Sequence, residues 1–355
     1  MSIRGSAGRS TLAHRIERLC AVEPDLRALR RAVLEAIRPT IGFDWYVWVL
    51  TDPLTSVGVD PIARVPGLDR LPALIGAKYT SGVNRWTTLA DVAPLPGAPV
   101  GADPWLAVLA AHDVRDVLSV VLRDRYGYWA FLDLWRRGRP YVEEEIATVA
   151  SLVPPLTEAT RRGCASTFGP APGADQATPL PGSPPPGPAV VLLDDELRVE
   201  GWTAGADAWL ARLLPPRPGR SPIPAAAFNV AAQLRARELG IDGHEAMARV
   251  HLTRGGWIRL QASRVEPSGQ ITVTIEPATP ADRIDLFSRA YGLTDREREV
   301  LEAVVGGADC RKVAERLFIS PLTLQDHLKA LFAKSGAHSR GDLVGRVLGV
   351  GGGAP

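Results

Sequence analysis

Residues 293–345 read LTDREREVLEAVVGGADCRKVAERLFISPLTLQDHLKALFAKSGAHSRGDLVG. Apolar residues recur there at the three- and four-residue spacing of amphipathic helices, in three short blocks. The glycine pair at 306–307 ends the first block, because glycine accepts the left-handed conformation found at helix ends. A tight turn at 318–320 separates the second block from the third. The stretch therefore predicts three short helices with the last two closely joined.

Four polar side chains occupy the positions expected of helix caps. Thr294 and Glu297 have the T-x-x-E spacing of a capping box. Asp309 precedes the second block, and Ser320 precedes the third with Pro321 at the first helical position, where a missing N–H costs nothing. Three capped helices with a tight second turn are the layout of a helix-turn-helix, which places one helix in the major groove of DNA.

The third predicted helix has an apolar face and a polar face. We expect six residues to contact DNA, the last two through phosphate: Thr323, Gln325, Asp326, Lys329, Lys334 and Arg340. Residues 311–346 hold seven basic and three acidic side chains, an excess that suits a few phosphate contacts and also suits an ordinary solvated surface. Asp326 is unusual, because a carboxylate repels phosphate. It should read a base edge such as cytosine N4 or lie over a gap.

This segment resembles the C-terminal domain of the LuxR/NarL family of bacterial transcription regulators. The family patterns L-T-x-R-E-x-E-V-L, I-A-x-x-L-x-I-S and T-V-x-x-H correspond to LTDREREVL at 293–301, VAERLFIS at 313–320 and TLQDH at 323–327. This chain has Val313 where the family pattern has isoleucine and Leu324 where it has valine. Both are substitutions between core residues of similar size. The resemblance implies a homodimer on double-stranded DNA, with half-sites about one helical turn apart.

The composition of the whole chain is that of a multidomain globular protein. Its 355 residues suggest two or three domains, and 46% of them are hydrophobic. No run of 18 apolar residues predicts a membrane helix, and the first residues lack the apolar core of a secretory signal. The three cysteines have no metal-binding spacing. We therefore expect a cytoplasmic protein with no metal, no cofactor and no enzymatic activity.

One proline-rich stretch divides the chain. Residues 165–188 hold eight prolines in 24 residues, which suits an exposed linker and not a packed element. The predicted organisation is a sensor domain at 1–163, a linker at 164–188, a second sensor domain at 189–279, a connecting helix at 280–292 and the helix-turn-helix domain at 293–350.

The first domain combines helices with antiparallel strands. We expect a helix or helix pair broken near Pro24, strands at 44–50, 116–123 and 127–136, a helix at 103–113 and a closing helix at 141–162. This α+β order resembles a GAF domain, a fold that often holds a small ligand. Six of the nine tryptophans lie here, and Trp45, Trp48 and Trp129 are candidates for a ligand pocket or for ordinary core.

The second domain is also α+β. Two short strands at 189–194 and 197–202 precede helices near 204–214 and within 223–239, and three strands follow at 247–254, 257–265 and 270–276. That order resembles a PAS domain.

Two classes of function fit the whole pattern. The first is a sequence-specific DNA-binding transcriptional regulator whose N-terminal domains sense a small ligand or partner. The alternative is a ligand-sensing interaction module whose tail contacts the transcription machinery, such as RNA polymerase, instead of DNA. An enzyme is disfavoured, because the sequence has no phosphate-binding loop, no zinc spacing and no paired nucleophile and base.

Overall fold

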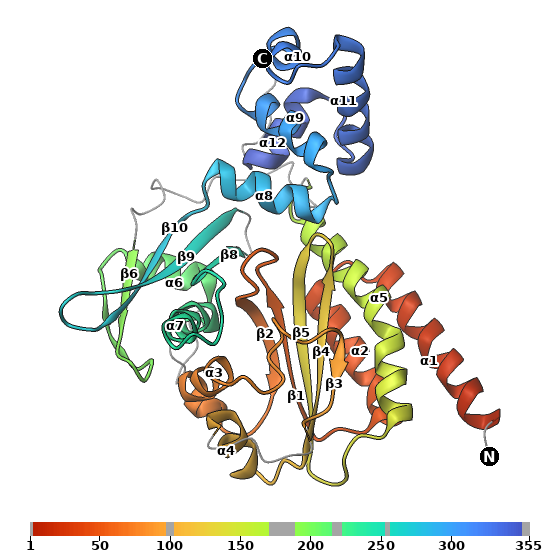
Figure 1. Ribbon diagram of the computed structural model, residues 1–355, viewed down its shortest axis with the longest axis vertical. Coiled ribbons are helices and arrows are strands. Elements are labelled where there is room, and N and C mark those ends of the chain that lie inside the picture. Colours follow the sequence, from red (N-terminus) through yellow and green to blue (C-terminus); the bar gives the residue numbers. More distant parts are fainter. Residues whose placement is uncertain (1–2, 97–102, 170–188, 215–221, 253–255, 350–355) are drawn as a thin grey trace. The chain divides into compact units, whose positions relative to one another are not determined.

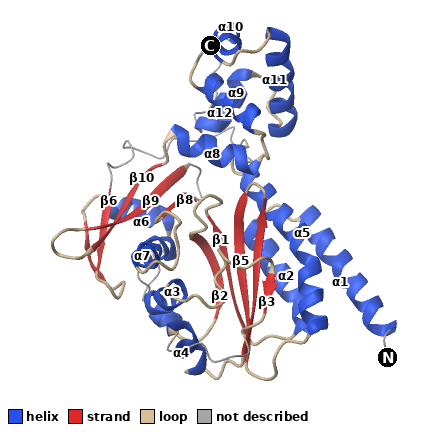
Figure 2. Ribbon diagram, in the orientation of Figure 1, coloured by secondary structure: helices blue, strands red, loops and turns tan. Residues whose placement is uncertain are grey.

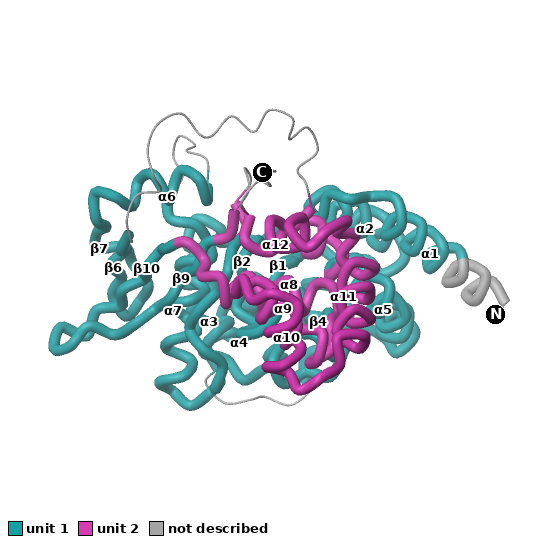
Figure 3. Tube along the Cα trace, turned by 90° about the horizontal axis from the view of Figure 1, so that it is seen from above, with its two compact units in different colours: residues 1–160, 185–250, 258–276 teal, residues 161–184, 251–257, 277–355 magenta. Residues whose placement is uncertain are grey.

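The computed structural model describes residues 3–96, 103–169, 189–214, 222–252 and 256–349, with side chains from residue 11 onward. Contacts group the chain into two compact units (Figure 3). The first unit contains residues 1–160, 185–250 and 258–276, and the second contains 161–184, 251–257 and 277–355.

The first unit contains two five-stranded sheets (Figure 2). One sheet has the order β2-β1-β5-β4-β3 and antiparallel neighbours. Its strands are β1 (Trp45–Thr51), β2 (Gly58–Arg64), β3 (Val92–Ala93), β4 (Asp116–Asp124) and β5 (Gly127–Arg136). The three strands expected from the sequence are present as β1, β4 and β5. The sequence missed β2, which contains Pro61 and lies at the sheet edge, where a proline without an N–H is tolerated.

Helices cover both faces of this sheet, as its two-sided apolar strands require (Figure 1). One face packs against α1 (Ile3–Val22), α2 (Leu26–Ile41) and α5 (Glu143–Ser166). The other packs against α3 (Leu71–Tyr79) and α4 (Pro104–Ala110). Trp48 is buried on the first face, whereas Trp105 and Trp135 are buried on the second.

The second sheet has the order β7-β6-β10-β9-β8. Its strands are β6 (Ala189–Leu193), β7 (Val199–Trp202), β8 (Met247–His251), β9 (Trp257–Arg264) and β10 (Ile271–Pro277), with α6 (Ala206–Leu213) and α7 (Ala225–Glu238) between β7 and β8. The expected sequence of two strands, helices and three strands is confirmed. Numbered within each sheet, both sheets have the same strand order, 2-1-5-4-3.

Helix α7 packs against both α3 and β2 and is buried along most of its length. Its two buried amides have partners in both halves of the unit. Asn229 donates to the carbonyl of Gly58 over 2.8 Å, and Gln233 accepts from Arg85 over 3.0 Å and donates to the carbonyl of His244 over 3.0 Å. A Cβ on Gly58 would lie 2.7 Å from the Val49 side chain and 2.9 Å from the Asn229 amide, so any other residue there would push these side chains away.

Two buried ion pairs link residues of the first sheet region to residues after α7. The guanidinium of Arg249 binds Asp52 through two bonds of 2.7 and 2.8 Å, and both side chains are almost fully buried. Arg85 binds Asp242 over 2.7 Å, again with both side chains buried. Burial alone would raise the pKa of Asp52, but the charge and hydrogen bonds of Arg249 outweigh burial and lower it. Each of these four buried charges therefore has a partner of opposite charge inside the unit.

The second unit is helical apart from short segments. It contains α8 (Pro280–Ala290), α9 (Asp295–Val305), α10 (Cys310–Arg316), α11 (Pro321–Ser335) and α12 (Arg340–Leu348), together with the last residues of α5. Helix α12 was not expected from the sequence. The linker expected from residue 164 begins later, because α5 continues to Ser166 and Phe168 is buried against Trp257 and Phe287. The rest of that linker, 170–188, lies outside the described residues.

Replacing Asp52 with alanine should leave the guanidinium of Arg249 buried without a countercharge. Breaking one side of a buried pair costs about 3–5 kcal/mol, so the free energy of unfolding should fall by that amount in urea denaturation of the full chain. Glu196→Ala is the matched control, because Glu196 pairs with Arg198 at the surface and its loss should cost less than about 1 kcal/mol. Equal losses in the two variants would contradict a structural role for the buried pair.

Candidate functional site

Helix α11 is held by caps and by a buried apolar face. The structure has caps at each of the four residues assigned to them from the sequence. Thr294 and Glu297 form a reciprocal capping box at α9, Asp309 accepts from the backbone of Lys312 over 2.9 Å at α10, and Ser320 accepts from the backbone of Thr323 over 3.0 Å at α11. The buried side of α11 packs through Leu324 and Leu331, with Leu328 and Phe332 partly buried beside them.

The opposite side of α11 is exposed. Thr323, Gln325, Asp326 and Lys329 are all exposed, so four of the six expected DNA contacts on this domain are open to solvent. Asp326 and Lys329 form an ion pair of 3.3 Å, with about two-thirds or more of each side chain exposed. The acidic group that stood out in the sequence therefore has a basic partner one turn away, and the pair contributes little net charge to this face.

Lys334 and Arg340 make bonds within the domain. The Lys334 ammonium donates to the Glu297 carboxylate over 2.6 Å and to the carbonyl of Gly292 over 3.1 Å. Arg340 donates to the carbonyls of Ala308 and Val304, near the C-terminal end of α9. Both cations therefore hold α9 in place relative to α11 and α12, in addition to any contact with DNA.

A basic side chain that the sequence analysis did not select lies on α10. Arg316 is exposed and has no ion pair within the residues that the structure describes, whereas Arg311 on the same helix pairs with Glu315 over 2.9 Å. Its unpaired charge makes Arg316 a further candidate for a phosphate contact. In the sequence, Arg316 counted only as one of the basic residues of the C-terminal segment. Which arginines form ion pairs could not be predicted, because that depends on the folded helix.

The first unit contains a cavity of about 310 Å³ on the α3 side of the first sheet. Apolar side chains make up much of its wall, with Val47, Val49 and Phe131 from the sheet and Leu74 and Ile75 from α3. Two residues at the start and middle of α7, Ala225 and Asn229, complete one side. Its wall also holds four charged side chains, which belong to Arg27, Arg31, Lys78 and Asp133. A largely apolar cavity with some polar groups is the usual form of a small-molecule site.

One buried ion pair lines this cavity. The Lys78 ammonium lies 2.8 Å from the Asp133 carboxylate and 5.0 Å from the centre of the Trp105 ring. The sequence carried a signal for it. Lys78 ends an apolar helix and Asp133 interrupts an apolar strand, and a charge in such a segment is buried only with a partner. The sequence pattern does not show that Lys78 and Asp133 are partners, because their contact depends on how α3 packs against the sheet.

The tryptophans predicted for a pocket lie elsewhere. Trp48 is packed in the core on the opposite face of the sheet, and Trp129 donates to Asp124 over 2.9 Å. The guanidinium of Arg137 lies over the Trp45 ring, with its central carbon 5.0 Å from the ring centre. None of the three lines the cavity.

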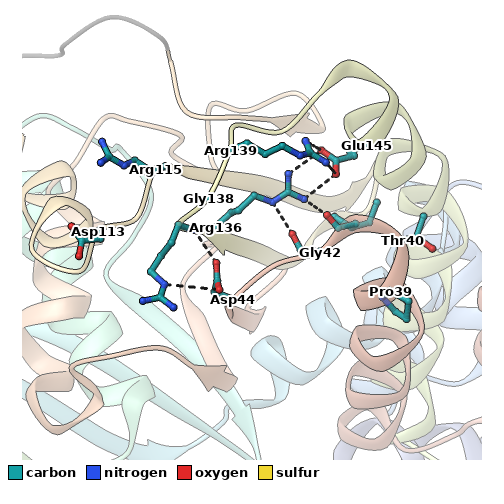
Figure 4. Close-up of a pocket in the computed structure, with 12 residues that line it drawn as sticks. Pro39, Thr40, Gly42, Asp44, Asp113, Arg115, Arg136, Gly138, Arg139 and Glu145 are labelled. Atoms are coloured by element: carbon teal, nitrogen blue, oxygen red, sulfur yellow. Dashed lines mark hydrogen bonds and ion pairs between the residues drawn. The ribbon is translucent and has the colours of Figure 1, made fainter.

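A wider hollow of about 780 Å³ lies near the ends of α2 and β5 (Figure 4). Arg136 is buried there and donates twice to Glu145, over 2.9 and 3.0 Å, and once to the carbonyl of Gly42 over 2.7 Å. Arg139 also binds Glu145, over 2.7 Å. These bonds connect the end of β5 to the end of α2 and to the start of α5. The cluster therefore stabilises the fold, and Glu145 already pairs with the arginine charges that an anion would need.

The described part of the chain contains neither a metal-binding cluster nor a membrane-spanning helix. There, no group of three or more His, Cys, Asp or Glu side chains could hold a metal ion. Over the same residues, every helix is too short or too polar to cross a membrane.

Comparison with known proteins finds a match at the C-terminal end. Residues 292–347 match the family model GerE, which describes bacterial regulatory proteins of the luxR family. A Mycobacterium tuberculosis protein described as an HTH-type transcriptional regulator is 45% identical over 58 residues, or 16% of this chain and 7% of that protein. The transcriptional regulatory protein DesR of Bacillus subtilis is 36% identical over 62 residues, or 18% of this chain and 31% of DesR. The chain thus covers less than a third of either relative.

Solved structures align over more of the chain but loosely. Escherichia coli SdiA aligns with 97% of this chain and 96% of its own at 12% identity, with a TM-score of 0.35. CepR2 from Burkholderia cenocepacia, described as an N-acylhomoserine lactone dependent LuxR family transcription factor, aligns with 43% of this chain and 93% of its own at 18% identity, with a TM-score of 0.34. The similarity to the luxR family is a sequence match confined to residues 292–347.

The bond between Lys334 and Glu297 should make the second unit sensitive to acid. Burial alone would raise the pKa of Glu297, but the hydrogen bond and charge of Lys334 and the backbone bond of Thr294 lower it below its usual 4.5. A carboxylate with a lowered pKa in the folded state adds stability above its unfolded value and loses it as the pH falls through the folded value. The stability of this unit should therefore decline as the pH drops below 4.5.

Lys334→Met should reduce that decline and lower the stability at neutral pH by about 1–3 kcal/mol, because the buried carboxylate loses its partner. Thermal unfolding followed over a pH series measures both effects. Lys312→Met is the control, because the Lys312 side chain is 74% exposed and pairs with Asp309 at 3.5 Å. A pH profile unchanged in Lys334→Met would show that the bond does not stabilise the domain.

Proposed function

We propose that this chain, whose residues 292–347 form a LuxR-family helix-turn-helix domain, is a sequence-specific DNA-binding transcriptional regulator. The observation that carries the proposal is the exposed polar face of α11, which lies opposite a buried apolar face in a capped three-helix arrangement. This is the geometry in which a recognition helix enters the major groove.

The roles of the individual residues follow from their chemistry. Gln325 and Asp326 would meet base edges, where an amide recognises adenine and a carboxylate accepts from cytosine N4. Thr323 and Lys329 would contact the backbone or the groove edge. For Lys334 and Arg340, the phosphate role expected from the sequence remains part of this proposal, alongside their bonds within the domain.

The first unit would act as the sensor. We assign a GAF-like fold to the first sheet with its helices and a PAS-like fold to the second, and the strand order shared by the two sheets supports a common architecture. The cavity beside Lys78 and Asp133 would hold a small, mostly apolar molecule with a polar group directed at that pair. A ligand there would touch α7, whose amides bind both halves of the unit.

The resemblance of the C-terminal domain also supports a homodimer on a two-fold DNA site and action in the cytoplasm. The alternative is a tail that binds RNA polymerase or another part of the transcription machinery without DNA. Gel-shift assays of the full chain with DNA selected from a random pool separate the two, because only the DNA-binding regulator should enrich a defined sequence.

Lys329→Ala should weaken binding to the selected DNA and flatten its dependence on salt. Each phosphate neutralised by a basic side chain releases bound counterions, so losing one contact should reduce the slope of log K against log salt by about one unit. Affinity measured over a salt series checks this. Arg64→Ala, which removes an exposed positive charge from β2, should leave both affinity and slope unchanged. A slope unchanged in Lys329→Ala would reject a phosphate contact.

Native mass spectrometry of the purified full chain should detect a bound small molecule. Leu74→Trp would fill part of the cavity and should abolish that extra mass, whereas Leu68→Ala at the cavity rim should retain it. The same extra mass in Leu74→Trp would place the ligand elsewhere, and its absence from the wild-type chain after growth in several media would argue against a tightly bound ligand.

A further inference from the structure

Two large hydrophobic side chains of the second unit are left in solvent at the start of α11. Phe318 is 95% exposed and Leu322 is 67% exposed, and within the described part of this unit no other large hydrophobic side chain is comparably open. A single exposed hydrophobic residue is ordinary on a protein surface. The significance of Leu322 comes from its position on the helix.

Helical geometry places Leu322 on the face assigned to the groove. With 3.6 residues per turn, residues seven apart lie almost directly above one another, so Leu322 is in line with Lys329. Gln325 and Asp326, three and four residues along, flank the same line. All of these side chains are exposed, whereas Leu324 and Leu331 are buried on the far side. Phe318 precedes the helix, so the helical period assigns it to no face.

The chemistry of Leu322 limits what it can recognise. Its side chain has no donor or acceptor, so it cannot read the hydrogen-bonding edge of a base. The apolar group that the major groove offers is the C5-methyl of thymine. Leu322 also lies in the first turn of α11, and the N-terminal residues of a recognition helix are those that reach base edges.

We infer that Leu322 is a specificity-determining residue that packs against a thymine methyl group in each half-site. The inference rests on the proposed DNA-binding function and adds a base preference to it. The apolar contact lies at the N-terminal end of the exposed line, and the polar side chains of Gln325, Asp326 and Lys329 follow it. The preferred half-site should therefore hold an A·T pair next to the pairs that Gln325 and Asp326 read.

Replacing thymine with deoxyuridine tests the contact directly, because it removes the methyl group and keeps base pairing. The preferred site is first selected from a random DNA pool with the full-length chain, and each thymine is then replaced in turn. At one thymine per half-site, binding should weaken about fourfold, as expected for one buried methyl group. Leu322→Ala should weaken binding to the thymine site and should no longer distinguish thymine from deoxyuridine there.

Two control variants make the test specific. Leu322→Met keeps an apolar side chain of similar size and should keep the discrimination. Leu239→Ala removes a leucine that is 61% exposed at the end of α7 in the first unit, and it should bind both DNAs as the wild type does. Circular dichroism and thermal unfolding of each variant verify that helix content and stability match the wild type before binding is compared.

The outcomes separate this contact from the function on which it rests. If the chain selects no DNA sequence, the proposed function and this contact both fail. If it selects a site but Leu322→Ala discriminates thymine from deoxyuridine as strongly as the wild type, the contact alone is overturned. Loss of discrimination in Leu322→Ala, with discrimination kept in Leu322→Met, supports it.

Discussion

The ion pair between Asp52 and Arg249 is the constraint on which the first unit depends. Removing two charges from water costs several kcal/mol for each ion, and that cost is offset only when geometry and hydrogen bonds are complete. Here Asp52 accepts two bonds from the guanidinium of Arg249 and one from its backbone N–H. Asp52 follows β1 of the first sheet and Arg249 lies in β8 of the second, so neither charge is satisfied until both sheets are in place. The pair makes the folding of the two sheets interdependent.

Helix α7 extends that interdependence to the cavity. Asn229 lines the cavity and binds the carbonyl of Gly58, whereas Gln233, one turn later, binds Arg85 and the carbonyl of His244. A molecule in the cavity would therefore touch a helix whose hydrogen bonds extend into the region that leads to β8. Ligand binding can shift a conformational equilibrium only through contacts that differ between two states, and contacts on α7 would meet that requirement if the helix moves.

Local features were predictable from the sequence, whereas distant pairs were not. The caps at Thr294 and Ser320 depend on residues within three positions, and the apolar runs of β1 and β5 are visible within their own short stretches of sequence. The bonds of Lys78 to Asp133 and of Lys334 to Glu297 join residues far apart in sequence, so they require the fold. Helix α3 was not expected from the sequence, because its residues other than Lys78 are mostly apolar and show no helical stripe.

The pairing of Asp326 with Lys329 changes how the helix-turn-helix would attract DNA. Because the two charges largely offset each other, the exposed face of α11 supplies little net positive potential of its own. Further attraction to phosphate would come from neighbouring groups, of which Arg316 is exposed and has no ion pair among the described residues. The N-terminal end of α11, where backbone N–H groups favour anions, would add to it. Charge would position the domain from α10 and from the start of α11. The face formed by Leu322, Gln325 and Asp326 would then be free to discriminate between bases by shape and hydrogen bonding.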